Sequence, residues 1–364
     1  MKLEKIEISG YKSYNQDKHS LDLGDVTVLL GANGAGKSNL ISFFNLIAYG
    51  MTGGLQDYLK KNDVNSLLYY GPEYTQDMSF AFHFRDDKVV DDYHVSLSYA
   101  KPERLYVSLE KFRYEKAGAD RPYEKKLDGD FELSLIREYD PTINVLKFLL
   151  KNIRVYQFHD TSDTARVKRS GYIDDSAYLR SDAGNLAAFL YRMKKNEPKY
   201  YERIAMYIRK VMPQFKDFCI ESFDEKNVRL NWVGFNNDNY LFGPHQLSDG
   251  SLRFMALATL LLQPPRTLPK VVVLDEPELG LHPQAVHVLA SMIKMASQNA
   301  QVIVSTQSPS LVDEFSANQI AVIERDDLKK TSIIKRLDEN NLRDWLDEYS
   351  LSELCDKNVL GGQP

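Results

Sequence analysis

The sequence predicts an α/β protein that combines a mixed sheet, an antiparallel β subdomain and a helical insertion. Short apolar strands alternate with helices at both ends of the chain, which is typical of a largely parallel sheet. Residues 78–110 instead have the two-residue period of antiparallel strands, and residues 141–215 have the pattern of helices. We therefore expect lobe I at residues 1–140, the helical insertion at 141–215 and lobe II at 216–364.

The composition is that of an ordinary globular protein that can bury a full core. Of the 364 residues, 43% are hydrophobic and 27% are charged, and the net charge is -5. These values exclude a disordered chain and argue against a uniformly basic protein that coats nucleic acid, although they leave room for a local basic groove. The two cysteines, Cys219 and Cys355, lie too far apart in the sequence for a disulfide framework or a zinc cluster.

Nothing in the sequence indicates secretion or a membrane. The chain begins with charged residues where a signal peptide needs an apolar run, and its longest apolar stretch, residues 254–262, is too short to span a bilayer. We therefore expect a cytoplasmic protein without a membrane partner. His282 and His287 are five residues apart, off the spacing of helical zinc pairs, and are expected to be structural.

The first third of the chain is expected to consist mainly of strands. After short strands near Ile6 and Ile8, the apolar run at 26–30 predicts a buried parallel strand, and residues 40–48 predict a buried helix. Alternating apolar residues then predict three antiparallel strands with one covered face. These strands are expected at residues 78–84, 93–99 and 105–109, with turns at Asp86, Asp87 and Pro102.

The middle of the chain is expected to be helical. Pro141 marks a helix start, a second helix is expected near Ser176, and a third is expected from about Lys199 to Met212. No heptad pattern persists, which excludes a long coiled-coil arm.

The last third returns to alternating helices and strands, which implies a parallel sheet with right-handed crossovers. The helices are expected at residues 251–262 and 285–296, and the strands at 271–274, 302–304 and 320–323. The tail after Arg325 is too short for another full domain.

Residues 31–38 (GANGAGKS) match the phosphate-binding loop pattern in full. Small residues let the backbone wrap around phosphate oxygens, and the following helix N-terminus supplies positive potential. Lys37 is expected to reach the β- and γ-phosphates, and the Ser38 hydroxyl is expected to bind Mg²⁺. The flanking strand and helix disfavour the alternative of an ordinary glycine-rich turn. The candidate binding residues are Asn33, Gly34, Ala35, Gly36, Lys37, Ser38 and Asn39.

Asp275 and Glu276 follow the apolar strand at 271–274. The strand would deliver Asp275 to a position where it can hold the water shell of Mg²⁺, while Glu276 can act as a general base towards water. The alternative is a strand that merely ends in a solvated acidic turn.

A short Ser-Asp-Gly-Ser segment at 248–251 opens the helix that contains Arg253. Ser248 and the backbone N–H groups at this helix start can bind an anion. The alternative is a common helix cap, and the position of the segment shortly before Asp275 favours the anion site.

With these motifs, the chain resembles the P-loop NTPase heads of ABC-type ATPases in the SMC/RecF class. More narrowly, it is similar to the stand-alone bacterial AAA family (AAA_21-like) ATPases that are related to the OLD and RecF ATPase heads. The resemblance rests on the phosphate loop and on residues 8–14, 248–251, 275–278, 279–283, 305–309 and 345–362.

The resemblance implies binding of ATP and Mg²⁺ in a sandwich homodimer. Ser248 and Gly250 of one chain would touch the γ-phosphate held by the other chain. Gln157 would be the glutamine that couples the metal to the inserted lobe. Gln307 would stand at the catalytic switch position beside Glu276 and Lys37; because an amide cannot take a proton, slow turnover is expected.

Two functions follow from this reading. The first is a dimeric, Mg-dependent ATPase whose closure acts on DNA or on a DNA-acting effector, in DNA repair or antiphage defence. The tail after Arg325 leaves no room for a fused nuclease, so cleavage would come from a partner. The alternative is a slow or non-cycling scaffold or sensor that assembles with a toxin or nuclease. The wide separation of Lys37 and Asp275 argues against a transporter subunit, and a metabolite kinase would not explain the signature segment.

Several basic and aromatic residues allow two interpretations. The basic residues Arg192, Lys194, Lys195, Lys199 and Arg203 are better explained by a solvated helix face than by nucleic-acid contact. A loop is the preferred interpretation for Arg166, Lys168 and Arg169, and packing is preferred over base stacking for Tyr191, Tyr200, Tyr201 and Tyr207.

Overall fold

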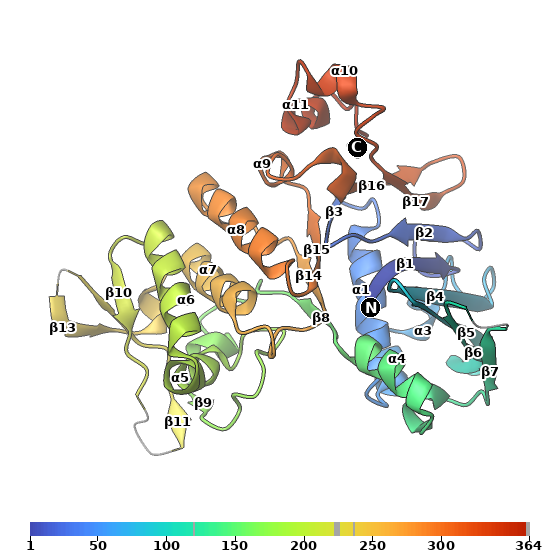
Figure 1. Cartoon of the computed structure of the whole chain (residues 1–364), viewed down its shortest axis with the longest axis horizontal. Helices are drawn as coiled ribbons and strands as arrows, with labels where there is room; N and C mark the ends of the chain where they lie inside the picture. The colour runs from blue at the N-terminus through green and yellow to red at the C-terminus, as the bar shows by residue number, and fades with distance from the viewer. Residues whose placement is uncertain (119–120, 222–225, 236, 362–364) are drawn as a thin grey trace. The chain divides into compact units, whose positions relative to one another are not determined.

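A computed structural model describes residues 1–118, 121–221, 226–235 and 237–361 (Figure 1). The chain forms two compact units. Unit 1 contains Met1–Arg154 and Ser316–Pro364, and unit 2 contains Val155–Phe315. These units reflect packing alone and divide the chain at other positions than the three expected lobes, which stay a prediction.

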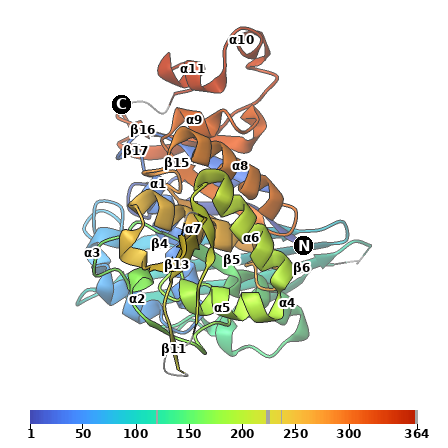
Figure 2. The same ribbon diagram turned by 90° about the vertical axis from the view of Figure 1, so that its left-hand side faces the viewer.

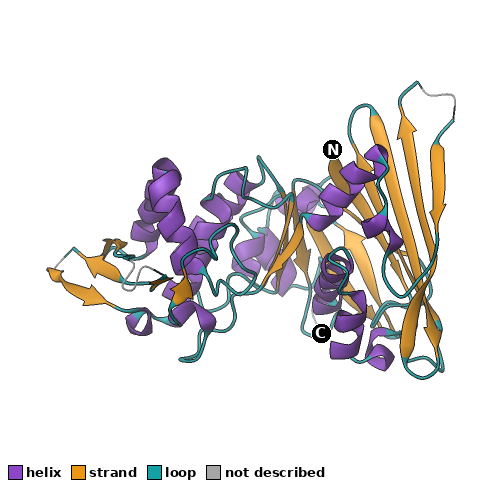
Figure 3. Ribbon diagram, turned by 90° about the horizontal axis from the view of Figure 1, so that it is seen from below, coloured by secondary structure: helices purple, strands orange, loops and turns teal. Residues whose placement is uncertain are grey.

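Unit 1 is built on a six-stranded antiparallel sheet, seen as a broad layer in Figure 3. Its strands, in spatial order, are β2 (His19–Asp22), β1 (Lys2–Ser9), β4 (Asp77–Arg85), β5 (Val89–Ala100), β6 (Arg104–Lys116) and β7 (Tyr123–Leu127). The three antiparallel strands predicted from alternation are therefore confirmed as β4, β5 and β6. One face is apolar: the ring of Phe43 stacks on Phe82, with centroids 5.4 Å apart, and lies 4.9 Å from Phe80.

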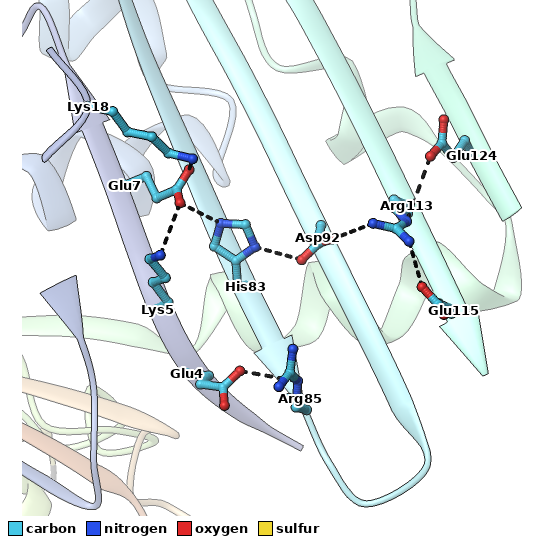
Figure 4. A network of polar contacts seen from close by, with 10 residues as sticks. All are labelled: Glu4, Lys5, Glu7, Lys18, His83, Arg85, Asp92, Arg113, Glu115 and Glu124. Carbon is cyan, nitrogen blue, oxygen red and sulfur yellow. Dashed lines mark hydrogen bonds and ion pairs between the residues drawn. The ribbon is translucent and has the colours of Figure 1, made fainter. Parts of the chain in front are cut away.

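The other face of this sheet carries a network of charged side chains (Figure 4). A ring nitrogen of His83 lies 2.7 Å from a carboxylate oxygen of Asp92, and the other ring nitrogen lies 3.5 Å from Glu7. Arg113 follows at 3.8 Å from Asp92 and also pairs with Glu115 at 2.6 Å. The hydrogen bond to Asp92 raises the pKa of His83, so this network links neighbouring strands through opposite charges.

Three strands of unit 1 that belong to a six-stranded mixed sheet position the phosphate loop. Strand β3 (Val26–Leu30) is buried at all five residues and pairs in parallel with β16 (Ile320–Asp326). Strand β16 pairs antiparallel with β17 (Thr331–Arg336). Helix α1 (Lys37–Gly50) follows the loop after β3, as predicted.

Shorter elements complete unit 1. They are α2 (Leu55–Lys61), α3 (Val64–Leu67), η1 (Ser134–Arg137), α4 (Pro141–Lys151), η4 (Ala317–Gln319), α10 (Arg343–Leu346) and α11 (Leu351–Asp356). The helix start at Pro141 is confirmed. Strand β8 (Ile153–Tyr156) runs across the change from unit 1 to unit 2.

In unit 2, parallel strands β14 (Val271–Asp275) and β15 (Gln301–Thr306) pair Asp275 with Ser305. Helices α6 (Pro198–Val211), α7 (Asp249–Leu262) and α8 (Pro283–Ala296) pack side by side (Figure 2). From Leu252 to its end, α7 is buried on all sides, as its unbroken apolar sequence predicts. The predicted strands and helices of this region are confirmed, and the short α9 (Pro309–Val312) follows β15.

The remaining elements of unit 2 are short, apart from α5 (Leu186–Asn196). They are η2 (Arg166–Lys168), β9 (Gly171–Tyr172), β10 (Phe215–Phe218), β11 (Asn227–Val228), β12 (Trp232–Gly234), β13 (Asn237–Phe242) and η3 (Pro244–Gln246). The helix expected near Ser176 is wrong, because that segment consists of turns and the first helix begins at Leu186. The amide of Asn185 donates to the carbonyl oxygens of Asp175 and Tyr178, so side-chain hydrogen bonds replace a helical turn.

The longest helices in the described ranges have 14 residues, so this part of the chain forms no coiled-coil arm. None of the helices described here combines the length and the apolarity that crossing a membrane requires.

Candidate nucleotide-binding site

The phosphate loop is seated against strands β16 and β17 of unit 1. A Cβ atom on Gly31 would lie 2.3 Å from the carbonyl oxygen of Ile323, and one on Gly36 would lie 2.3 Å from the hydroxyl of Ser332. Gly36 also has a φ of 118°, which favours glycine. Close contact with neighbouring atoms therefore requires glycine at these two positions. Helix α1 begins at Lys37, within the loop, with its N–H groups available to phosphates.

Lys37 lies in the centre of this loop. Its side chain is buried, and its ammonium donates to the carbonyl oxygens of Gly31 at 2.5 Å and Ala32 at 3.0 Å. In the rest of the motif, Asn33, Gly34 and Ser38 are exposed, Ala35 and Gly36 are buried, and Asn39 is partly exposed. Asn39 donates to the hydroxyl of Ser13 at 2.8 Å, which ties the start of α1 to the turn after β1.

A cleft with a volume of about 820 Å³ opens beside the loop within unit 1. Its lining includes Lys12 and Ser13 together with Tyr69, Tyr70 and Arg325. The rings of Tyr69 and Tyr70 lie 4.7 Å apart, and Tyr70 is 58% exposed. Aromatic faces beside a phosphate loop suit a nucleobase. Sequence reasoning missed the tyrosines and Arg325 because no motif spacing marks them, whereas Lys12 and Ser13 fall in the segment 8–14 that carried the resemblance.

In unit 2, the side chains of Gln157, Asp275 and Ser305 meet at the end of β14. The carboxylate of Asp275 accepts from the hydroxyl of Ser305 at 2.6 Å and from the amide of Gln157 at 2.8 Å. Gln157 and Asp275 are 118 residues apart in sequence. Carboxylate and amide oxygens are ligands that Mg²⁺ accepts, so the chemistry of this pair fits its part of the predicted donor set.

Glu276 adopts a left-handed backbone conformation, with a φ of 43°, directly after the strand. Its N–H donates to the carbonyl of Ser305 at 3.0 Å, and its carboxylate accepts from the amide of Gln307 at 3.1 Å. The structure therefore brings Glu276 and Gln307 together. A glutamate in a rarely occupied backbone region is consistent with a functional constraint.

Glu278 holds the segment that carries Gln307. It is buried, and its carboxylate accepts a hydrogen bond from the hydroxyl of Thr306, which in turn accepts from the N–H of Ser308 at 2.9 Å. Burial raises the pKa of Glu278. Glu278 thus fixes the end of β15 that carries Gln307. The sequence placed Glu278 in the resembling segment, but gave it no role.

The signature segment caps helix α7. The exposed Ser248 hydroxyl accepts from the N–H of Ser251 at 3.2 Å and donates to the hydroxyl of Ser251 at 2.8 Å. A Cβ atom on Gly250 would lie 2.5 Å from the carbonyl oxygen of Gly280, so only glycine fits there. The helix-cap alternative is confirmed, while contact of Ser248 and Gly250 with phosphate stays a prediction.

Arg253 joins the signature helix to two loops of unit 2. Its guanidinium donates to the carbonyl oxygen of Leu279, to that of Phe158 at 2.9 Å and to that of His159 at 3.4 Å. The side chain is buried. One arginine therefore holds α7, the loop after Glu276 and the loop after Gln157. Sequence reasoning noted Arg253 only as part of the segment, because its partners are not visible from spacing.

The comparison with protein families agrees with this geometry. Residues 26–313 match the family described as "AAA domain, putative AbiEii toxin, Type IV TA system". The chain belongs to this family. It is a P-loop ATPase of the ABC and SMC type that binds ATP, which confirms the resemblance to the SMC/RecF class.

Curated relatives match part of the chain. The energy-coupling factor transporter ATP-binding protein EcfA2 of Lactobacillus acidophilus is 30% identical over 145 residues, which are 38% of this chain and 47% of that protein. EcfA2 of Staphylococcus aureus (strain USA300) is 26% identical over 137 residues, 36% of this chain and 46% of that protein. The chain thus spans about half the length of the curated relatives it matches.

Solved SMC heads share the fold. An SMC head bound to the C-winged helix domain of ScpA has a TM-score of 0.61 at 17% identity, with 94% of this chain and 100% of that chain covered. A head from Pyrococcus furiosus, bound to the C-terminal domain of ScpA, has a TM-score of 0.59 at 16% identity, with 95% and 99% covered. These likenesses confirm the predicted α/β fold class with its P-loop NTPase head.

The basic and aromatic residues outside the site have intramolecular partners. Arg203 donates to the carbonyl of Leu262 at 2.6 Å, Lys194 pairs with Asp217 at 3.2 Å, and Tyr201 donates to Asp217 at 2.7 Å. Further partners are Ser176 for Arg192, Asp182 for Arg166, Asp163 for Lys168 and Glu314 for His287. These contacts support the structural interpretations. Over the ranges that the structure describes, no cluster of metal-ligating side chains is present.

Proposed function

We propose that this chain is an Mg-dependent ATPase that closes as an ATP-sandwich homodimer and acts on DNA or on a DNA-acting effector, in DNA repair or antiphage defence. The observation that carries the proposal is a set of two hydrogen-bonded pairs in unit 2, in which Gln157 donates to Asp275 and Gln307 donates to Glu276. Each of these residues has the chemistry that hydrolysis requires, and unit 1 supplies a complete phosphate loop with the buried Lys37.

Each site residue has a separate role in the proposed reaction. Lys37 and the N–H groups of the loop bind the β- and γ-phosphates, and the cleft beside Tyr70 accepts the base. Ser38, Asp275 and Gln157 would hold Mg²⁺, which neutralises charge on the phosphates when bound. Glu276 accepts the proton of the attacking water, and the amide of Gln307 orients that water or the γ-phosphate.

The homodimer would complete the site. Ser248 is exposed at the N-terminus of α7, where its hydroxyl and the helix N–H groups suit the γ-phosphate held by a second copy. Binding of a further protein is supported by the two SMC heads that are described as bound to domains of ScpA. The EcfA2 matches span too little of the chain to support a transport function.

Replacing Glu276 by glutamine tests the proposal. Loss of the general base should lower ATP turnover by roughly 10²–10⁴-fold. ATP binding and ATP-dependent dimerisation, measured by calorimetry and sedimentation, should persist. Glu314→Gln serves as a matched control, because Glu314 pairs with His287 outside the site. Unchanged turnover in Glu276→Gln would remove this role for Glu276.

The slow scaffold or sensor remains a second candidate because Gln307, which cannot take a proton, stands where a catalytic base would help. The two functions differ in turnover. Hydrolysis that double-stranded DNA stimulates supports the first, whereas a stable stoichiometric complex with a toxin or nuclease and negligible hydrolysis supports the second.

A further inference from the structure

A basic cleft with an exposed aromatic ring lies in unit 1, beside the C-terminal end of α4. It has a volume of about 570 Å³, within the range of roughly 300–1,000 Å³ that is common for ligand sites. Arg137, Lys151 and Arg154 line it together with Tyr139, and Met51 and Ile136 contribute apolar surface. No acidic residue is part of its described lining.

Tyr139 is the most unusual member of this cleft, because it is 92% exposed. An aromatic ring on the surface usually buries one face against the protein. The ammonium of Lys147 lies 5.8 Å from the centre of the Tyr139 ring, and it donates to the carbonyl oxygen of Glu138 at 2.6 Å. Lys147 can therefore support the ring while leaving it open to stacking.

Two of the acidic residues near the cleft have partners outside its lining. The carboxylate of Glu138 pairs with Lys125 at 2.5 Å, and that of Asp140 accepts from the hydroxyl of Tyr123 at 3.2 Å. Asp130 pairs with Arg137 at 3.2 Å, although the Arg137 side chain remains 63% exposed. Lys151 and Arg154 are exposed. With three basic residues and no acidic residue in its described lining, the cleft carries an excess of positive charge.

We propose that the α4 cleft, defined by Arg137, Tyr139, Lys151 and Arg154, binds a single strand of nucleic acid. The cations contact phosphates and Tyr139 stacks on an unpaired base. This inference deepens the proposed action on DNA and rests on that function.

An unpaired strand fits this cleft better than a duplex. Stacking on a side chain requires a base whose face is open, which a paired base inside a duplex does not offer. Stacking also tolerates any sequence, since each base has an aromatic face. The cleft should therefore bind single strands without marked sequence preference, and duplexes more weakly.

The test measures binding of full-length protein, without nucleotide, to a labelled oligothymidine of about 20 nucleotides and to a duplex of equal length. The variant Arg137→Ala/Lys151→Ala/Arg154→Ala should lose affinity at least about tenfold. The slope of log affinity against log salt should fall by about 2, at roughly 0.7 for each cation on a single strand. Tyr139→Ala should lose about 5- to 100-fold in affinity with an unchanged salt slope.

Lys195→Ala/Lys199→Ala/Lys210→Ala is the matched control, because it removes the same charge from exposed positions of α5 and α6. It should bind oligothymidine like the unmodified chain, and thermal unfolding should show that all variants are folded. Absent oligothymidine binding, equal losses in the control, oligothymidine binding that Tyr139→Ala does not weaken, or a duplex bound as tightly as oligothymidine would each overturn the proposal. So would polyglutamate that binds the cleft as well as oligothymidine does, since it would indicate an acidic protein partner.

ATP turnover without DNA separates this inference from the proposed function. The variants of the α4 cleft should hydrolyse ATP like the unmodified chain in the absence of DNA. Hydrolysis without oligothymidine binding would support the proposed ATPase and contradict the proposed nucleic-acid site. Oligothymidine binding that depends on the cleft residues, without any hydrolysis, would support the nucleic-acid site and contradict the ATPase.

Discussion

At the scale of single residues, the site depends on a few side chains that hold one another in place. The Asp275 carboxylate has two hydrogen-bond donors, Ser305 and Gln157, and the Glu276 carboxylate has Gln307. A carboxylate that is fixed by its neighbours presents its remaining lone pairs in a defined direction, which is how residues around a metal site tune its affinity. The geometry therefore predicts that Gln157 matters even where it is not itself a ligand.

Replacing Gln157 by alanine should lower the apparent affinity for Mg²⁺ by about 10- to 100-fold, because Asp275 loses a positioning hydrogen bond. Turnover measured against Mg²⁺ concentration would show this as a shift of the half-saturation point. Gln298→Ala, an exposed glutamine after α8, should leave the curve unchanged. An unshifted curve for Gln157→Ala would separate Gln157 from the metal.

At the scale of elements, the signature helix α7 is held by a single buried arginine. Arg253 donates to three carbonyl oxygens on two loops, one after Gln157 and one after Glu276. A planar guanidinium can satisfy several acceptors in fixed directions, whereas an ammonium cannot reproduce that fork. Burial lowers the pKa of Arg253, which remains charged.

Arg253→Lys should lower the free energy of unfolding by about 1–3 kcal/mol, because buried carbonyl oxygens lose their partners. Turnover should also fall, while ATP binding to the phosphate loop should be retained, since Lys37 and its loop belong to unit 1. Urea unfolding and nucleotide titration measure the two effects. Arg266→Lys is the control, because Arg266 is exposed and paired with Glu197. Wild-type values in both assays would show that the fork is dispensable.

In the antiparallel sheet, the buried Asp91 makes the stability of the protein depend on pH. This carboxyl group is 1% exposed, and burial, together with Asp86 and Asp92, raises its pKa to about 7. The folded state therefore binds a proton that the unfolded state has lost above about pH 4. Its contribution to stability is complete at low pH and is lost as the pH rises from about 4 to 7.

Asp91→Asn should remove this dependence. The difference in the free energy of unfolding between the two proteins should change with pH by up to about 1.4 kcal/mol per pH unit between about pH 4 and 7. Urea unfolding at a series of pH values measures it, with the exposed Asp87→Asn as control. A constant difference across this range would mean that Asp91 ionises normally.

At the scale of the whole molecule, the candidate site residues are distributed over two compact units. The phosphate loop and the cleft beside it lie in unit 1, and the residues around Asp275 and the signature segment lie in unit 2. In the proposed homodimer, each nucleotide would contact the phosphate loop of one copy and Ser248 of the other. Two-fold symmetry then makes both sites equivalent.

This geometry predicts complementation between two inactive variants. Lys37→Ala and Ser248→Ala should each have little turnover alone. An equal mixture should recover about a quarter of wild-type turnover, because half of the dimers are mixed and each has one intact site of two. The control mixes Lys37→Ala with Glu276→Gln. In the proposed sandwich, each of these substitutions disables the site that contains the phosphate loop of its own chain, so a mixed dimer has no intact site and no recovery is expected. No recovery with Ser248→Ala would rule out a head-to-tail sandwich.

The sequence by itself determined the local motifs and the elements that present them. The phosphate loop is predicted by Gly31, Gly36 and Lys37, which lie between an apolar strand and an apolar helix. The position of Asp275 at the end of a strand is predicted by the apolar run before it. Both predictions succeed because strand, turn and helix signals act over a few residues. Only the tertiary structure decided which distant side chains meet. Gln157 reaches Asp275 across 118 residues, and Arg253 reaches two loops, because such contacts depend on how strands and helices pack rather than on spacing along the chain.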